Sequence, residues 1–321
     1  MEKAQSPATA TIKGELFDII KPTRLRDGKV LRSKEREVYA RIGMKQAALE
    51  EQIHTVSLYE RGFPVARVLD SGDHSDSEWY FVEESLGHAP FHEQFANEYS
   101  SAGEVSDETF ERYAAVVGRY IDAQFAPANR TSIAAEEFVE LTIPDERIVG
   151  NYAACKKDVD RYKTAVELAT RRLEGSPMGV LQLDLNPYNI LDRGVIDFEL
   201  VGYGPLGYDT LLVSLWHRWF TSDQSSRYSV AYYLTESQVA TIAQEVSDAS
   251  NHADVPDPAQ YMQEFLLIKS AWGFSSSKSM YDEESSKRTF YEYRARLLEH
   301  CVDRYLASEP IDPFAFPEIR A

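Results

Sequence analysis

Cysteine is scarce in this chain, since only Cys155 and Cys301 occur among its 321 residues. The two lie far apart and outside any CxxC pattern, so the sequence predicts neither a disulfide framework nor a thiolate metal site. The seven histidines offer no clear alternative: none pairs at a recognisable ligand spacing, and Pro90 separates His88 from His92. We therefore expect a protein of the reducing cytoplasm.

Long hydrophobic runs and an excess of basic residues are also missing. The N-terminal segment MEKAQSPATATIKGELF lacks an apolar signal core, and no apolar stretch approaches the length of a membrane span. The chain has 34 Lys and Arg against 52 Asp and Glu, a formal net charge of -18. This charge keeps a protein soluble, repels nucleic acid and anionic membranes, and only weakly favours a cationic partner. We expect no nucleic-acid or membrane partner, and the sequence makes no prediction of oligomeric state.

The first 86 residues read as a small unit of strands around one helix. Extended runs rich in β-branched and aromatic residues alternate with turn signals. These runs are TIKGELFDII, KVLRSK, EVYARIG, VARVLDSG and EWYFVEE. Apolar residues at helical spacing fill residues 45–62, where Gly62 suits a C-cap and Pro64 lies just beyond. We place a domain boundary between Ser85 and Pro90.

The remaining residues, 87–321, are predicted to be mostly helical. Helical periodicity or helix-start signals mark five regions: 107–125, 145–173, 208–220, the capping box Thr235 to Gln238, and a run opened by Asp257 with Pro258 in its first turn. A further long helix is expected from about Glu284 to Leu306. Only a hairpin near residue 190 interrupts this pattern.

That hairpin lies in LQLDLNPYNILDRGVIDFEL, residues 181–200. Asp184 and Asn189 are five residues apart, and Asp197 ends the second short strand. Oxygen-bearing side chains at strand ends suit a hard cation such as Mg²⁺, which keeps several waters and needs few protein ligands. Phosphoryl transfer requires such ligands and a carboxylate that accepts a hydroxyl proton. The alternative is that these short polar residues only form local hydrogen bonds with the backbone.

LDLNPYNIL followed by VIDFELVGYGPLGYD resembles the core of the aminoglycoside phosphotransferase and choline kinase group, small-molecule kinases with a protein-kinase-like fold. The resemblance implies an α+β, two-lobed fold, with a small antiparallel-sheet N-lobe and a larger, mostly helical C-lobe. It implies that Asp184 is the catalytic base, that Asn189 and Asp197 are metal ligands, and that Asp209 braces the catalytic loop. The family pattern has His-Gly where this chain has Gln182 and Leu183, which puts the bracing of that loop in question.

The resemblance extends to the N-terminal lobe. LYERGFPVARVLDSGD followed by EWYFVEESLG is similar to the family's helix end, next two strands and hinge, which places Glu51 at the position of the paired glutamate. Arg41 then takes the place of the phosphate-binding lysine, with Lys45 as a second candidate. The adenine is expected at the backbone from Glu83 to Leu86. No GxGxxG motif precedes Arg41.

The function implied is transfer of the γ-phosphate of ATP or GTP, with Mg²⁺, to a hydroxyl of a small molecule. An aminoglycoside-like antibiotic, an amino alcohol or a sugar would fit as the acceptor. The alternative is a degenerate kinase fold that binds nucleotide or a partner without phosphorylating it; Arg41, Gln182 and Leu183 motivate this alternative. A protein kinase proper is less favoured, because no APE pattern follows Asp197.

Overall fold

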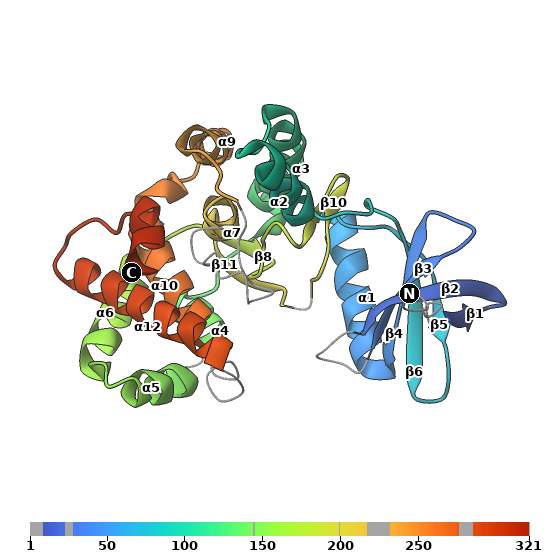
Figure 1. The fold of residues 1–321 in the computed structure, drawn as a ribbon, viewed down its shortest axis with the longest axis horizontal. Helices are drawn as coiled ribbons and strands as arrows, with labels where there is room; N and C mark the ends of the chain where they lie inside the picture. The colour runs from blue at the N-terminus through green and yellow to red at the C-terminus, as the bar shows by residue number, and fades with distance from the viewer. Residues whose placement is uncertain are drawn as a thin grey trace.

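An antiparallel sheet and a set of helices occupy opposite sides of the molecule in the computed structural model (Figure 1). The structure describes residues 9–22, 28–143, 145–198, 200–216, 232–275 and 285–320. The elements on the sheet side are β1 Thr9–Ile12, β2 Glu15–Pro22, β3 Lys29–Ser33, β4 Val38–Met44, α1 Lys45–Glu60, β5 Val68–Asp73 and β6 Glu78–Glu84. The sheet and its one helix form the N-lobe of the expected two-lobed kinase-like fold.

The strands of the N-lobe run in the order β1-β2-β3-β4-β6-β5, and neighbours are antiparallel. Along β4, Val38, Ala40 and Ile42 are buried and pack into a small apolar core with residues of β1, β2, β3 and β6. The alternating residue Arg41 faces the other side, where it meets Glu51 of α1. The sheet therefore has an apolar face and a face that carries charge toward α1.

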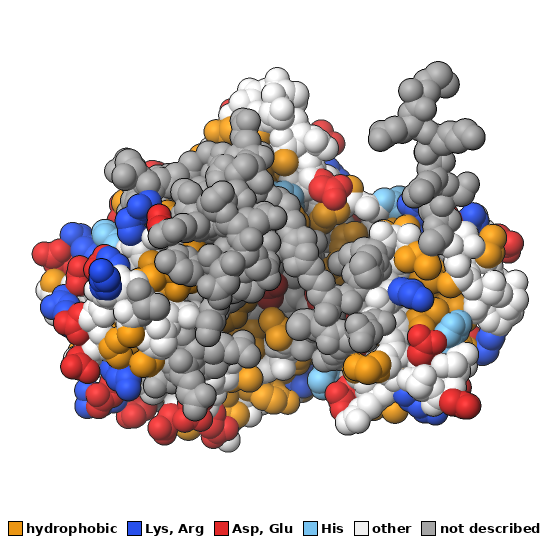
Figure 2. Space-filling model, turned by 60° about the horizontal axis from the view of Figure 1, so that its bottom comes forward, with side chains coloured by type: hydrophobic (Ala, Val, Ile, Leu, Met, Phe, Trp, Pro, Cys, Tyr) orange, Lys and Arg blue, Asp and Glu red, His pale blue; other side chains and the backbone are white. Residues whose placement is uncertain are grey.

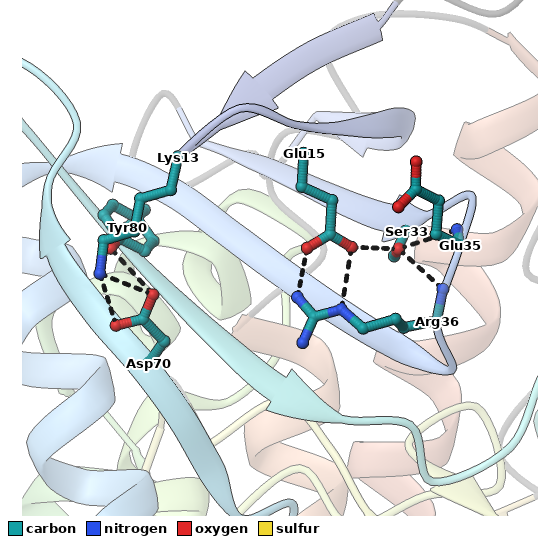
Figure 3. A network of polar contacts seen from close by, with 7 residues as sticks. All are labelled: Lys13, Glu15, Ser33, Glu35, Arg36, Asp70 and Tyr80. Atoms are coloured by element: carbon teal, nitrogen blue, oxygen red, sulfur yellow. Dashed lines mark hydrogen bonds and ion pairs between the residues drawn. The ribbon is translucent and has the colours of Figure 1, made fainter.

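The sheet curls until its two edges meet. Lys13, in the turn between β1 and β2, donates to both carboxylate oxygens of Asp70 on the opposite edge strand β5, at 2.9 Å each (Figure 3). A second cluster in the same view links Glu15 of β2 to Ser33 and Arg36. The sequence predicts one extended run over TIKGELFDII. This prediction is wrong, because a turn that contains Lys13 at a φ of 48° divides the run into β1 and β2.

Helices dominate the second lobe, as expected, around three short strand pairs. Its elements are α2 Phe91–Ala102, α3 Asp107–Phe125, η1 Pro127–Asn129, β7 Arg130–Thr131, α4 Ala135–Thr142, α5 Asp145–Ala154, α6 Val159–Leu173, β8 Met178–Leu181, β9 Ile190–Leu191, β10 Gly194–Val195, β11 Gly202–Pro205, α7 Tyr208–Val213, α9 Glu236–His252, η2 Pro258–Tyr261, α10 Met262–Ser275, α12 Ser285–Leu306 and η3 Pro313–Arg320. Helix α10 is buried on nearly all sides and packs against α5, α6, α7 and α12. None of the described helices is both long and apolar enough to cross a membrane.

Local signals explain several of these helix ends. The capping box of Thr235 and Gln238 is confirmed at the start of α9. Asp257 caps a short 3-10 helix ahead of α10 rather than α10 itself. The expected helix over 145–173 is two helices, because Lys156 adopts a φ of 56° and Asp158 caps the new start of α6. Residues 217–220 of the expected helix 208–220 lie outside the described residues.

The turn between β9 and β10, residues 192–194, joins the two lobes. The Val195 amide donates to the carbonyl of Pro64 at 2.7 Å, and the Arg193 amide donates to the carbonyl of Leu86 at 2.9 Å. A Cβ on Gly194 would lie 2.2 Å from that Pro64 oxygen, so only glycine allows this approach. The sheet ends at Glu84 and α2 begins at Phe91; the division into domains at residues 86 and 87 stays a prediction.

Replacing Gly194 with alanine should therefore force the 192–194 turn away from the N-lobe. We expect Gly194→Ala to lower the free energy of unfolding by about 1–3 kcal/mol, the usual cost of overpacking. The matched control is Gly150→Ala on α5, where an added Cβ meets nothing within 4 Å, so stability should be unchanged or rise by up to ~1 kcal/mol. Equal effects of the two substitutions in urea unfolding would contradict this account of the turn.

Candidate active site

Two of the expected site residues of the C-lobe, Asp184 and Asn189, lie on one short loop, residues 182–189, between β8 and β9; we call it the Asp184 loop. The Asp184 carbonyl accepts hydrogen bonds from the side-chain amides of Asn186 at 2.7 Å and Asn189 at 3.1 Å. The side-chain N–H groups of Asn186 and Asn189 therefore do form local hydrogen bonds with the backbone, as the alternative hypothesis predicts. This leaves the Asn189 Oδ1 as the group that can bind a metal. On the outer side of the loop, Tyr188 stacks on His92 with ring centroids 3.6 Å apart.

The carboxylate of Asp184 lies in a largely buried environment. Burial raises its pKa to about 6, although Lys269 and the hydrogen bond from Asn186 oppose the rise; Asp197 and Asp209 add to it. At neutral pH the group is mainly ionised yet close to the range in which a carboxylate takes up a proton. This is the property that a general base requires.

Asp209, on α7, fixes the start of the Asp184 loop, as the resemblance implies. Its Oδ2 accepts hydrogen bonds from the amides of Gln182 at 2.6 Å and Leu183 at 3.2 Å, and from the Tyr120 hydroxyl at 3.2 Å. Asp209 is only 3% exposed, and burial raises its pKa while these donors lower it. The backbone just before Asp184 is therefore held by a buried charge.

Asp197 ends the hairpin and turns back toward the Asp184 loop. It adopts a left-handed φ of 67°, and its carbonyl accepts a hydrogen bond from the Gln182 side chain at 2.7 Å. Its carboxylate forms no hydrogen bond or ion pair within the described residues, yet its charge raises the pKa of both Asp184 and Arg41. The Asp197 carboxylate therefore lies between the Asp184 loop and the N-lobe, with its oxygens available.

The donors fit a magnesium ion. Among the described residues, no three His, Cys, Asp or Glu side chains gather as a closed metal site. The Asn189 Oδ1 and the Asp197 carboxylate offer hard oxygen ligands, and both are positioned by hydrogen bonds of their own residues. Mg²⁺ commonly takes one or two protein ligands and completes its shell with water and phosphate oxygens.

One cluster contains the three expected site residues of the N-lobe, Arg41, Glu51 and Glu83. The Arg41 Nη1 lies 2.5 Å from Glu51, the Arg41 Nε lies 3.2 Å from Glu83, and all three side chains are largely buried. Burial alone lowers the pKa of Arg41, but the carboxylates of Glu83, Glu51 and Asp197 outweigh it and raise that pKa. Lys45, the second candidate for this role, instead pairs with Asp73 at the surface.

Two parts of this geometry could not be found from sequence patterns. The side chain of Glu83 joins the Arg41 cluster, although only its backbone was expected to contribute. Lys269 approaches the Asp184 loop from α10, 86 residues beyond Leu183 in the chain, and donates to the Leu183 carbonyl at 3.0 Å. The only signal for Lys269 was a lysine within the apolar run FLLIKSAWGF.

The Arg41 cluster should make a measurable contribution to stability. Arg41→Met leaves two buried carboxylates without their cation, so we expect a loss of about 3–5 kcal/mol in the free energy of unfolding. Adding Glu83→Gln to that variant should recover part of the loss. The control is Arg161→Met, whose partner Asp303 is 56% exposed and whose loss should stay below ~1 kcal/mol. Similar small losses for both arginines in denaturant unfolding would contradict the assignment.

Comparisons with known proteins show the family and the fold of this chain. A model of the phosphotransferase enzyme family matches residues 26–242, more than half of the chain. A thermostable variant of the aminoglycoside phosphotransferase APH(4)-Ia, solved with AMP-PNP and hygromycin B, is 11% identical over 94% of this chain and 95% of its own, with a TM-score of 0.57. Another variant, with ADP and hygromycin B, is 11% identical over 89% and 93%, with a TM-score of 0.56.

A provisionally named aminoglycoside phosphotransferase from Ralstonia eutropha is 11% identical over 96% of this chain and 95% of its own, with a TM-score of 0.57. At such identities the structural likeness shows the fold alone. No curated protein matches the sequence significantly. The match to the family model shows more than the fold: this chain belongs to the phosphotransferase enzyme family.

Proposed function

We propose that this protein transfers the γ-phosphoryl group of ATP or GTP to a hydroxyl group of a small molecule. The observation that carries the proposal is the placement of three groups on one braced segment. Asp184 has a half-buried carboxylate with a raised pKa, and Asn189 and Asp197 offer side-chain oxygens near it. Asp197 also lies close enough to Arg41 to raise its pKa, which connects this segment with the N-lobe.

In the proposed reaction, Asp184 orients the acceptor hydroxyl and accepts its proton. The hydroxyl oxygen forms a bond to the γ-phosphorus while the bond to the bridging oxygen breaks, and a nucleoside diphosphate leaves. Asn189 and Asp197 would hold Mg²⁺, which when bound neutralises charge on the phosphate oxygens. The protein contributes mainly by positioning these groups in a site with little water.

The nucleotide would lie between the Arg41 cluster and the segment that joins the lobes. Arg41 uses Nε and Nη1 for its two carboxylates, and a guanidinium has further N–H donors for phosphate oxygens. Backbone groups of Ser85 and the Leu86 carbonyl already have protein partners. The Leu86 amide has no hydrogen-bond partner among the described residues, so it is the group we assign to the nucleotide base.

A hydroxylated, cationic acceptor is the class that we favour. The structurally similar APH(4)-Ia was solved with hygromycin B and with ADP or AMP-PNP, and the present chain carries a formal net charge of -18. Figure 2 shows acidic side chains interspersed with basic ones at the end of the molecule that the helical lobe forms. The net negative charge of the whole chain attracts cations at long range. Aminoglycoside-like antibiotics, amino alcohols and sugars remain the acceptors to test.

The second candidate function is a nucleotide-binding protein without transfer activity. Arg41 motivates it, and so do Gln182 and Leu183 in place of the family's His-Gly pair. However, the side-chain amide of Gln182 donates to the carbonyls of both Ile196 and Asp197. The connection between the Asp184 loop and the hairpin end is therefore made without histidine. This supports an active enzyme over the binding protein.

Incubation with Mg-ATP and a panel of hydroxylated antibiotics, amino alcohols and sugars tests the proposal. We expect a phosphate ester, detected by phosphorus resonance or mass shift. Asp184→Asn and Asp197→Ala should each lower turnover by ~10³-fold or more while circular dichroism stays unchanged, because they remove the base and a metal ligand. Asp303→Asn, at the surface pair with Arg161, should keep wild-type turnover.

Wild-type turnover in either site variant would contradict the assigned roles. Binding of Mg-ATP without any phosphorylated product across the panel would instead favour the binding protein.

A further inference from the structure

Lys269 is a buried lysine that belongs to no recognised motif of the chain. Its residue is 5% exposed on α10, and its Nζ lies 3.6 Å from the centroid of the Trp272 ring. Its Nζ also donates to the Leu183 carbonyl at 3.0 Å. Burial of an ammonium group is costly unless specific partners compensate it. A second aromatic ring, that of Trp216 just beyond α7, has its centroid 6.0 Å from the same Nζ.

Leu183 has an unusual backbone conformation directly before Asp184. Its φ of 65° is in the left-handed region, which is unfavourable for a residue with a Cβ and which glycine adopts freely. The related kinases have glycine at this position, by the resemblance described above. Contacts with other parts of the structure must hold Leu183 in this conformation, because leucine itself prefers a negative φ.

Two buried charges hold the backbone of Leu183 from its two ends. The Leu183 amide donates to Asp209 at 3.2 Å, and its carbonyl accepts from Lys269 at 3.0 Å. The Leu183 carbonyl belongs to the peptide bond that leads into Asp184, so the contact with Lys269 orients the Asp184 backbone directly.

Lys269 also balances the negative charge beneath the loop. The carboxylates of Asp184 and Asp209 both raise the pKa of Lys269, against burial, which lowers it, and against the nearby Arg294. Without Lys269, the half-buried carboxylate of Asp184 and the buried carboxylate of Asp209 would repel each other with no cation to balance them. The ring of Trp272 holds the ammonium in this position by a cation–π interaction.

We propose that Lys269 is a positioning residue of the active site, which holds the left-handed turn at Leu183 and thereby the Asp184 carboxylate that meets the acceptor hydroxyl. The inference rests on the proposed function, since it takes Asp184 as the base. It differs from a purely structural role for Lys269, in which a methionine of similar volume would pack equally well and leave the turn unchanged.

The test compares Lys269→Met and Lys269→Arg with the control Lys157→Met. Lys157 is a lysine of the same lobe that pairs with Glu299 away from the Asp184 loop. Hydrogen exchange of the peptide containing Gln182 and Leu183 is measured first. We expect exchange at least ~10-fold faster in Lys269→Met, because a charged hydrogen bond to the loop is lost, and wild-type exchange in Lys157→Met.

Turnover is measured in the same proteins. In Lys269→Met we expect kcat to fall by about 100-fold with the KM for ATP within about twofold, since a displaced base affects the reaction rather than nucleotide binding. Lys269→Arg keeps the charge and should recover part of kcat. If Lys269→Met does not fold, Lys269→Gln, which keeps an uncharged N–H donor, takes its place.

Unchanged exchange at Gln182 and Leu183 overturns the inference, and so does faster exchange with wild-type kcat. The exchange measurement needs no acceptor, so it tests the brace even if no acceptor is phosphorylated. The absence of any phosphorylated acceptor would contradict the proposed function without contradicting the role of Lys269 in holding the loop.

Discussion

The buried carboxylate of Asp209 is the interaction on which the rest of the site depends. It accepts hydrogen bonds from two successive backbone amides, at Gln182 and Leu183, and from the Tyr120 hydroxyl. A buried charge is stable only when its partners are fixed, so these bonds determine the backbone immediately before Asp184. The position of Asp184 follows from a contact made by another element, α7, and not from the conformational preference of the loop itself.

The N-lobe has a corresponding buried charge of opposite sign. Arg41 is held between Glu51 on α1 and Glu83 on β6, so the helix and the sheet are connected through one guanidinium. The β9–β10 hairpin binds the N-lobe at Pro64 through Val195 and the joining segment at Leu86 through Arg193. The same hairpin carries Asp197 at its end, so the contact between the lobes and the proposed metal ligand belong to one short segment. This explains how Arg41 in one lobe and the proposed base Asp184 in the other can keep a fixed separation.

The parts of the fold predicted from sequence are those with local causes. The capping box at Thr235 and the turn between β9 and β10 follow from residues close together in the chain. The division of 9–22 into two strands and the break at Lys156 were not predicted, because each requires a left-handed φ at a lysine, at Lys13 beside the left-handed Gly14 and at Lys156. Asp209 was predicted only through the family resemblance. The contacts of Glu83 and Lys269 arise from tertiary packing, for which the sequence has no periodic signal.

The central claim is that Asn189 and Asp197 together hold a divalent ion at a bound nucleoside triphosphate, next to Asp184. Electron paramagnetic resonance of Mn²⁺, titrated in the presence of AMP-PNP, measures this ion binding without any acceptor. The account predicts nucleotide-dependent Mn²⁺ binding that weakens more than ~10-fold in Asn189→Ala and in Asp197→Ala, with no change in Asp303→Asn. Equal Mn²⁺ affinity in all of these proteins would contradict it.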